Sequence, residues 1–270
     1  MSIIQAIILG IIEGITEFLP ISSTGHMVIA SSFMGIAEDS FTKLFTVAIQ
    51  LGAILAVVAL YWKRFLQTFD FYKKLFIAFL PAAVIGFIAS KWIDKVLGYP
   101  LVVGISLLAG GIVMLFVDKW FEKTENSEDK EVTYPAALKI GFFQTISILL
   151  PGISRSFVTI VGGLAQKLNR KNAVEFSFFL AVPTMFAATG YKLFEYWHKF
   201  KKGEGPGLPA HGISLLLLGN IIAFVVALIA IRTFITFLTK HGFKAFGYYR
   251  ILAGLLVIVL VLAKFHITMV

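Results

Sequence analysis

Long apolar runs separated by short polar segments make up most of this 270-residue chain. A helix that crosses a bilayer needs about 20 mainly apolar residues. Six runs have a suitable length, and we expect spanning helices at residues 41–62, 75–90, 99–117, 173–196, 213–238 and 248–264. The pattern therefore predicts an all-α, polytopic membrane protein.

Two further apolar runs are interrupted by polar residues and a Leu-Pro pair, at 9–28 and 136–166. In the first run Pro20 disfavours helical geometry in the residue before it, so the first arm should end at Leu19. A polar turn follows, and Ser23 or Thr24 is expected to cap a second short helix. Each arm is too short to span a bilayer. We therefore predict two re-entrant helical hairpins whose tips lie at membrane depth.

The second interrupted run repeats the first at an offset of 131 residues. The matches are Glu13 with Gln144, Leu19-Pro20 with Leu150-Pro151, Ser23 with Ser154, and Phe45-Thr46 with Phe176-Ser177. Each half then holds one hairpin and three spans, and this odd number turns the second half upside down in the membrane. We expect one integral membrane domain, 1–270, made of inverted repeats 1–117 and 135–270 with a hydrophilic linker at 118–134.

Composition supports the membrane assignment and excludes several functions. Charged residues make up 14% of the chain, against about 25% in soluble proteins. No cysteine is present, which excludes disulfides and thiolate chemistry. The net charge of +9 comes without a basic soluble domain, so we expect no nucleic-acid partner.

The distribution of basic residues predicts the orientation. With the N-terminus on one side, the opposite side receives fifteen Lys and Arg residues, and the N-terminal side receives eight. The positive-inside rule makes the richer side cytoplasmic. Both termini and the mouth of the first hairpin should then face outward.

The first interruption carries the polar groups that most need an explanation. Glu13 and Glu17 are four residues apart, so they share one helix face. A charged group at the bilayer centre costs about 2.5–3.5 kcal/mol on insertion scales, which favours a functional site over a structural network. Hydroxyl groups and an imidazole follow directly, at Ser22, Ser23, Thr24 and His26.

The second interruption differs, because it supplies Arg155 between Ser154 and Ser156, with Thr159 one turn further. A guanidinium fork suits phosphate or carboxylate, and the amides at a helix start also bind anions. Glu13 and Glu17 suit Mg²⁺ or Ca²⁺, which prefer oxygen ligands. If the tips meet, they form one asymmetric site suited to phosphoryl transfer.

Several alternatives stay open at this point. The attacking group is Ser23, His26 or a water molecule, and the spacing favours Ser23 with His26 or Glu17 as its base. The glutamates could instead only pair with Arg155. Gln50 is a further candidate for lining the site. Inverted repeats with broken helices are also a transporter design, so a lipid transporter or flippase is the alternative function.

Two motifs carry a resemblance to a known family. EGITEFLPISSTGH at 13–26 and PGISRSFVT at 151–159 resemble the signature motifs of bacterial undecaprenyl-diphosphate phosphatases, also called bacitracin-resistance proteins. The segment EFSF followed by LAVP at 175–183, the length and the duplication extend the resemblance over essentially the whole chain.

The resemblance implies an enzyme of the bacterial plasma membrane. It would remove one phosphate from undecaprenyl diphosphate, a polyprenyl diphosphate lipid, and so recycle the carrier for peptidoglycan synthesis. It also implies a divalent cation and a site that opens to the outer leaflet. The implied core is Glu13, Glu17, Ser23, His26 and Arg155, surrounded by Ser22, Thr24, Ser154, Ser156 and Thr159. Neither the choice of cation, the preferred polyprenyl length nor assembly into a homodimer follows from the sequence.

Overall fold

The computed structural model describes residues 1–66, 68–97, 99–125, 130–203 and 207–263. Within these residues every regular element is a helix, which confirms the all-α class. The helices are α1 (Ile3–Thr16), α2 (Ser23–Phe33), α3 (Ser40–Ala48), α4 (Gln50–Leu60), α5 (Trp62–Phe65), α6 (Phe69–Ile88), α7 (Ser90–Leu97), α8 (Pro100–Trp120), α9 (Glu122–Glu125), α10 (Tyr134–Leu149), α11 (Arg155–Ala165), α12 (Arg170–Lys201), α13 (Gly212–His241) and α14 (Lys244–Leu262).

Six segments of the described chain are long and apolar enough to cross a membrane, in agreement with the six predicted spans. The first of these segments, Ser40–Leu60, combines α3 and α4. Two connections begin later than expected. Helix α8 continues to Trp120, inside the predicted linker, and α12 continues to Lys201, inside the predicted 197–212 loop. Basic and aromatic side chains at these ends tolerate a membrane interface, so the helices extend beyond the purely apolar runs.

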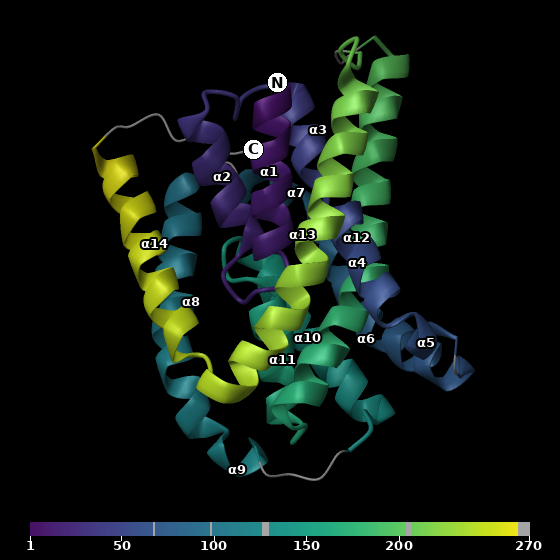
Figure 1. Cartoon of the computed structure of the whole chain (residues 1–270), viewed down its shortest axis with the longest axis vertical. Coiled ribbons are helices and arrows are strands. Elements are labelled where there is room, and N and C mark those ends of the chain that lie inside the picture. Colours follow the sequence, from purple (N-terminus) through teal and green to yellow (C-terminus); the bar gives the residue numbers. More distant parts are fainter. Residues whose placement is uncertain (67, 98, 126–129, 204–206, 264–270) are drawn as a thin grey trace.

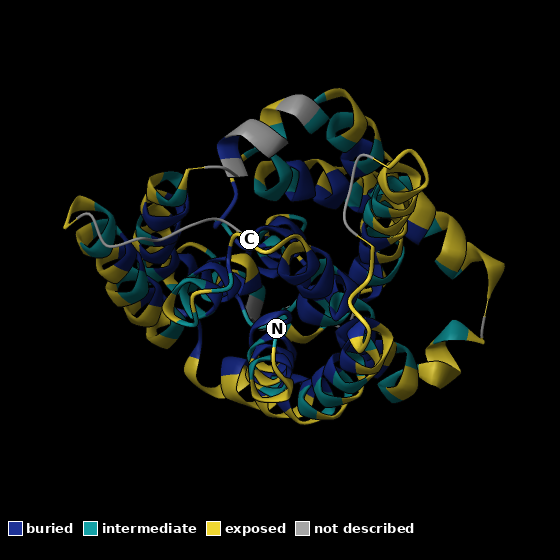
Figure 2. Cartoon of the chain, turned by 90° about the horizontal axis from the view of Figure 1, so that it is seen from above, coloured by how far each residue is buried: buried dark blue, intermediate teal, exposed yellow. Residues whose placement is uncertain are grey.

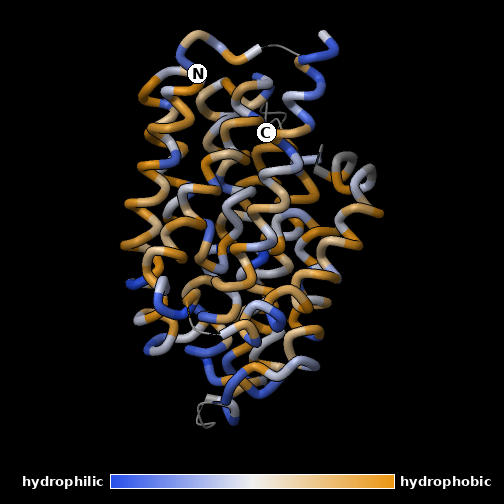
Figure 3. The backbone as a smooth tube through the Cα atoms, turned by 90° about the vertical axis from the view of Figure 1, so that its right-hand side faces the viewer, coloured by the Kyte–Doolittle hydropathy of each residue, from blue (hydrophilic) through white to orange (hydrophobic). Residues whose placement is uncertain are grey.

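The surface of the helix bundle is apolar around its middle. Figure 3 shows hydrophobic residues along most of the height and hydrophilic residues gathered mainly toward the two ends. Figure 2 shows exposed residues on the outer sides of the helices and buried ones in the centre. Phe87 is 80% exposed and Leu252 is 69% exposed. Large apolar side chains on the outside are expected of helices that face lipid.

The two interrupted runs fold as the predicted pairs of short helices, α1–α2 and α10–α11. Helix α1 has 14 residues and is therefore about 21 Å long, against about 30 Å for the hydrocarbon core of a bilayer. It ends at Thr16 with Glu17 as its C-cap, which is three residues before the predicted end at Leu19. Re-entry into the membrane stays a prediction.

The second arms start at serines with a left-handed backbone, Ser22 with φ 71° and Ser154 with φ 73°. The predicted cap at Ser23 or Thr24 is therefore wrong, because the Ser22 hydroxyl accepts the hydrogen bond from the Gly25 amide. The two caps are 132 residues apart, one more than the sequence offset of 131. Gly152, at φ 97°, is the additional residue of the second turn. Arg155 consequently occupies the helix position of Ser23 rather than that of Thr24.

Packing follows the duplication, since the first helix of each hairpin packs on a span of the other half: α1 on α13, and α10 on α6. Glycines allow both approaches. A Cβ at Gly10 would lie 3.0 Å from the carbonyl oxygen of Gly219, and one at Gly141 would overlap the backbone of Ala78. Helix α1 starts, and α14 ends, at the end of the molecule opposite α9 (Figure 1). These features support the inverted repeat, which stays a prediction.

One arginine joins the two hairpin tips. Arg250 of α14 is fully buried. Its guanidinium donates to the carbonyl oxygens of Pro20 at 3.1 Å, Ile153 at 2.8 Å and Gly152 at 3.0 Å. It also donates to two carbonyls of α8, and Gly110 of that helix leaves the room it needs, because a Cβ there would overlap Nη2. Arg250 therefore binds backbone groups of both tips at once.

We expect Arg250→Leu to lower the free energy of unfolding by about 3–5 kcal/mol, because it leaves several buried carbonyl groups without donors. Thermal unfolding in detergent, followed by intrinsic fluorescence, measures the effect. Arg232→Leu is the matched control, since Arg232 is an exposed arginine of α13. Equal midpoints for the two variants would mean that Arg250 does not hold the tips together.

Candidate functional site

The two hairpin tips meet around a cavity of about 290 Å³. Seven of the residues predicted for the site line it: Glu17, Ser22, Ser23, Thr24, Gln50, Ser154 and Arg155. The first four belong to the α1–α2 tip, the last two to the α10–α11 tip, and Gln50 opens α4. The structure thus brings residues that are far apart in sequence into one polar cavity.

Glu17 is the centre of the hydrogen bonding in this cavity. The Ser23 hydroxyl donates to Glu17 Oε2 at 2.5 Å, and Arg155 Nη2 donates to Glu17 Oε1 at 3.2 Å. The carboxylate is nearly buried, with 7% of its side chain exposed. One carboxylate therefore orients both a hydroxyl group from its own tip and a cation from the other tip.

Arg155 is the first residue of α11, where the free amides of a helix start also favour an anion. Its Nη1 donates to the carbonyl oxygen of Ser177 at 3.2 Å. Its Nε is buried without a hydrogen-bond partner among the described residues. The guanidinium is therefore anchored on two sides and retains an N–H that could donate a hydrogen bond to a phosphate oxygen.

Thr159 and Ser156 do not line the cavity, although both were predicted to bind phosphate. Thr159 Oγ1 pairs with Ser177 Oγ at 2.6 Å and donates to the Arg155 carbonyl at 2.9 Å. Ser156 Oγ donates to the Leu19 carbonyl at 2.9 Å, which joins the two tips. These hydroxyls support the site from behind, because their hydrogen bonds go to backbone groups and to a buried serine.

Glu13 lies one turn before Glu17 and is completely buried. Neither of its carboxylate oxygens has a hydrogen-bond partner among the described residues. Its counterpart in the second half is Gln144, which donates to Thr184 Oγ1 at 3.2 Å. The first half therefore keeps a costly buried acid where the second half has a satisfied neutral amide.

His26 lies in the first hairpin but contacts other groups. Its Nδ1 is 2.7 Å from the Ser22 carbonyl oxygen, which can only accept, so Nδ1 carries the proton. Its Nε2 is 2.5 Å from the hydroxyl of Tyr249, and the two rings stack with an angle of 3°. The expected contact with Ser23 is not made, since the Ser23 hydroxyl turns to Glu17.

Sequence reasoning missed three residues of the site: Ser177, Tyr249 and Arg250. Arg250 was one of the fifteen basic residues counted on the cytoplasmic side, although its side chain is fully buried inside the protein. Its position near the start of an otherwise apolar run could have marked it as a buried functional residue. Ser177 acts through its carbonyl and its hydroxyl, and Tyr249 acts through its hydroxyl and its ring, at positions that no sequence pattern distinguishes.

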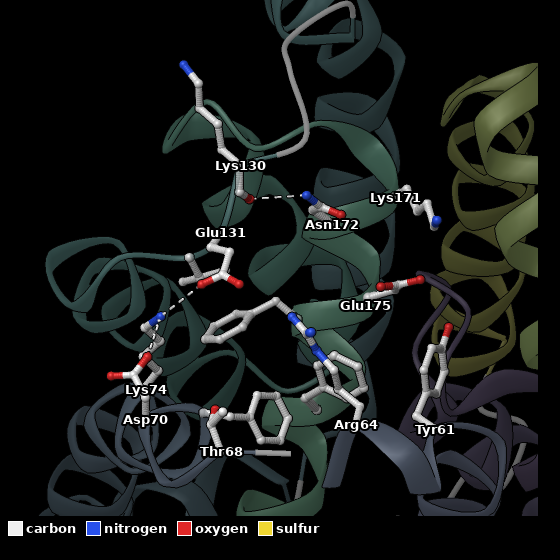
Figure 4. A pocket seen from close by; sticks show the side chains of 14 residues that line it. Tyr61, Arg64, Thr68, Asp70, Lys74, Lys130, Glu131, Lys171, Asn172 and Glu175 are labelled. Carbon is white, nitrogen blue, oxygen red and sulfur yellow. Dashed lines mark hydrogen bonds and ion pairs between the residues drawn. The ribbon is translucent and has the colours of Figure 1, made fainter. Parts of the chain in front are cut away.

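A second cavity, of about 540 Å³, lies elsewhere and contains none of the predicted catalytic residues. Figure 4 shows Lys74 of this cavity between Asp70 and Glu131, at 2.6 and 3.6 Å. Glu175 and Tyr61 both line this cavity. Burial, followed by the charge of Glu175, raises the pKa of the Tyr61 hydroxyl, so that group stays neutral.

Comparison with known proteins identifies the family. Residues 6–256 match the family described as "Bacitracin resistance protein BacA". A protein of Flavobacterium psychrophilum named undecaprenyl-diphosphatase is 60% identical over 99% of this chain and 98% of its own length. Proteins of the same name from Flavobacterium johnsoniae and Aquifex aeolicus are 56% and 46% identical over 96% and 93% of this chain, and over 96% and 95% of their own lengths.

The match covers both hairpins and the cavity where their tips meet, and nearly the full lengths of the relatives are aligned. The chain belongs to the bacitracin resistance protein BacA family.

Proposed function

We propose that this protein hydrolyses undecaprenyl diphosphate to undecaprenyl phosphate and phosphate. The relatives that are 45–60% identical to the chain carry the name of this activity. The observation that carries the proposal is the contact of Ser23, Glu17 and Arg155 across the two tips. A hydroxyl on a carboxylate beside a guanidinium is an arrangement for attack on phosphorus, and transport alone does not require it.

In the proposed reaction Ser23 Oγ attacks the terminal phosphorus while Glu17 Oε2 takes the hydroxyl proton. The bond between that phosphorus and the bridging oxygen breaks, and undecaprenyl phosphate leaves. Water then hydrolyses the phosphoserine and releases phosphate. Glu17 rather than His26 is the base, because it is the group that accepts the Ser23 hydrogen bond.

Arg155 and the amides at the start of α11 would hold the diphosphate. The pair with Glu17 uses Nη2, so a phosphate oxygen can approach Nε or compete for Nη2. Ser22, Thr24 and Ser154 line the same cavity and offer further polar contacts. A planar guanidinium can make two parallel bonds to phosphate, which stabilises the charge that builds up during transfer.

We propose Glu13 and Glu17 as the ligands of a divalent cation, Mg²⁺ or Ca²⁺. Among the described residues no three acidic, histidine or cysteine side chains come together as a metal cage. Mg²⁺ often needs only one or two carboxylates when substrate phosphates complete its shell. The unpartnered oxygens of buried Glu13 fit this role. When bound, the cation would neutralise charge on the diphosphate.

We propose further that the protein lies in the bacterial plasma membrane with its catalytic cavity open to the outer side. Arg250 is buried between the tips and must be removed from the cytoplasmic count, which leaves fourteen basic residues against eight. The positive-inside rule then gives the same orientation as before. The α12–α13 connection lies at the same end as the start of α1 (Figure 1).

Single cysteines at Glu38 and Lys202 should react with an impermeant maleimide in intact cells, and one at Glu122 should react only after lysis. The wild-type chain has no cysteine, so it provides a clean background. All three sites are exposed. The neighbouring Ala37 is not used for labelling, because it is only 3% exposed. The reverse labelling pattern would contradict the orientation.

Arg155→Lys and Glu17→Gln should each lower kcat/KM by about 10²–10³, because each removes a charged contact that stabilises the transition state. Lysine keeps the charge but cannot make two parallel bonds. The assay is phosphate release from a polyprenyl diphosphate in detergent, with and without Mg²⁺ or Ca²⁺. His198→Ala and His211→Ala are controls and should remain near the wild-type rate. Wild-type rates in both site variants would exclude the proposed site.

Rapid quenching with labelled polyprenyl diphosphate should trap phosphate on Ser23. Serine phosphate survives acid, whereas phosphate on a histidine nitrogen does not, so acid and base treatment separate the two. Ser23→Ala is expected to abolish the label, and Ser154→Ala, at the opposite tip, should retain it. Phosphate on nitrogen would make His26 the nucleophile and overturn the assignment of roles.

A further inference from the structure

A groove leads away from the catalytic cavity. It has a volume of about 380 Å³ and lies between α6, α7, the end of α10, and α12. Ile93 and Ile148 line both the groove and the catalytic cavity, so the two adjoin each other. Most of the groove lining is aliphatic or aromatic, in contrast to the polar cavity. An apolar channel thus starts where the diphosphate is proposed to bind.

The groove exists because one interface of the duplicated fold is closed and its counterpart is not. By their order in the two halves, α4 corresponds to α12 and α6 corresponds to α13. The interface between α4 and α13 therefore corresponds to the interface between α12 and α6. Gly52 closes the first interface: a Cβ there would overlap the Asn220 backbone, and its amide donates to Asn220 Oδ1 at 2.7 Å. At the sequence offset of 131, Gly52 corresponds to Pro183 of α12. Proline has no amide hydrogen and a bulky ring, so the same close approach is not available.

Small residues on both walls keep the groove open. Ala82, Ala83 and Gly86 line it from α6, and Ala187 and Ala188 line it from α12. A Cβ added at Gly86 would meet only the Ile148 side chain, at 4.0 Å. The lining extends from Phe79 to Phe87 on α6, which is about 12 Å along the helix.

The groove is open along its side. Phe87 lines it and is 80% exposed, on the surface that faces lipid. A chain in the groove could therefore continue sideways into the membrane while its head stays in the polar cavity. An apolar groove that opens to lipid beside a polar cavity does not suit a wholly polar ligand. It suits a long apolar chain attached to an anionic head group.

We propose that the groove binds the first isoprene units of the polyprenyl chain, next to the diphosphate. This rests on the proposed function for the identity of the head group. The tail already lies in lipid before it enters the groove, so the groove contributes close packing against the methyl-branched chain rather than transfer out of water. The groove thereby selects for an isoprenoid tail and holds the phosphorus at the tips.

The test fills the groove without touching the polar cavity. Gly86→Trp and, from the opposite wall, Ala187→Trp should raise KM for farnesyl diphosphate by about tenfold or more. Inhibition by inorganic diphosphate, which has no tail, should keep its wild-type Ki in both variants. Gly190→Trp is the matched control: Gly190 is exposed, has nothing within 4 Å of an added Cβ and does not line the groove. Equal KM in the groove variants and the control would overturn the proposal.

A second readout is independent of hydrolysis. A farnesyl diphosphate analogue with a benzophenone at its distal end should label peptides 79–93 and 184–192, and unlabelled farnesyl diphosphate should compete. Labelling should be lost in Gly86→Trp and kept in Gly190→Trp. Labelling elsewhere, or labelling that farnesyl diphosphate does not reduce, would show a general lipid surface and overturn the groove. Absence of phosphate release with correct labelling would overturn only the proposed function.

Discussion

Backbone groups that a broken helix leaves unpaired have no water to bind inside a bilayer, so the protein must satisfy them itself. Both hairpin turns expose such carbonyl groups next to the catalytic cavity. Arg250 satisfies Pro20 in one turn and Gly152 and Ile153 in the other, and it also reaches α8. An arginine suits this role because its planar fork carries five donors and keeps its charge. The positions of the two tips, and hence the cavity, depend on this interaction.

The catalytic cavity depends on differences between two similar halves. Ser22 and Ser154 cap equivalent helices with the same left-handed backbone, yet the next residue is a serine in one half and an arginine in the other. The proposed nucleophile and the proposed phosphate-binding cation therefore occupy equivalent helix positions on opposed tips. Glu17 lies between them and bonds to both. The two tips therefore share a backbone frame and differ in the side chains that they place at equivalent positions.

The same divergence explains the route of the substrate tail. Gly52 seals one interface between the halves, whereas Pro183 prevents equal closure of the other. The open interface lies beside the proposed nucleophile and faces lipid. An enzyme that cleaves a membrane-embedded diphosphate needs both a polar, enclosed head site and an apolar exit. Here the two hairpin tips form the polar head site, and the open helix interface forms the apolar exit.

The sequence by itself predicted the helical class and the six spans, and it indicated a duplication with a polar tip in each hairpin. These follow from local properties: run length, the Leu-Pro interruptions and the repeated spacing of polar residues. The tertiary structure decided which groups touch. It turned Ser23 toward Glu17 and His26 toward Tyr249, removed Ser156 and Thr159 from the cavity, and buried Arg250 among carbonyl oxygens. The contacts of His26 with Tyr249 and of Arg250 with Pro20 join residues 223 and 230 positions apart, and the turn of Ser23 toward Glu17 depends on how the tip folds. Their geometry depends on helix packing and on the one extra residue, Gly152, that no local pattern encodes.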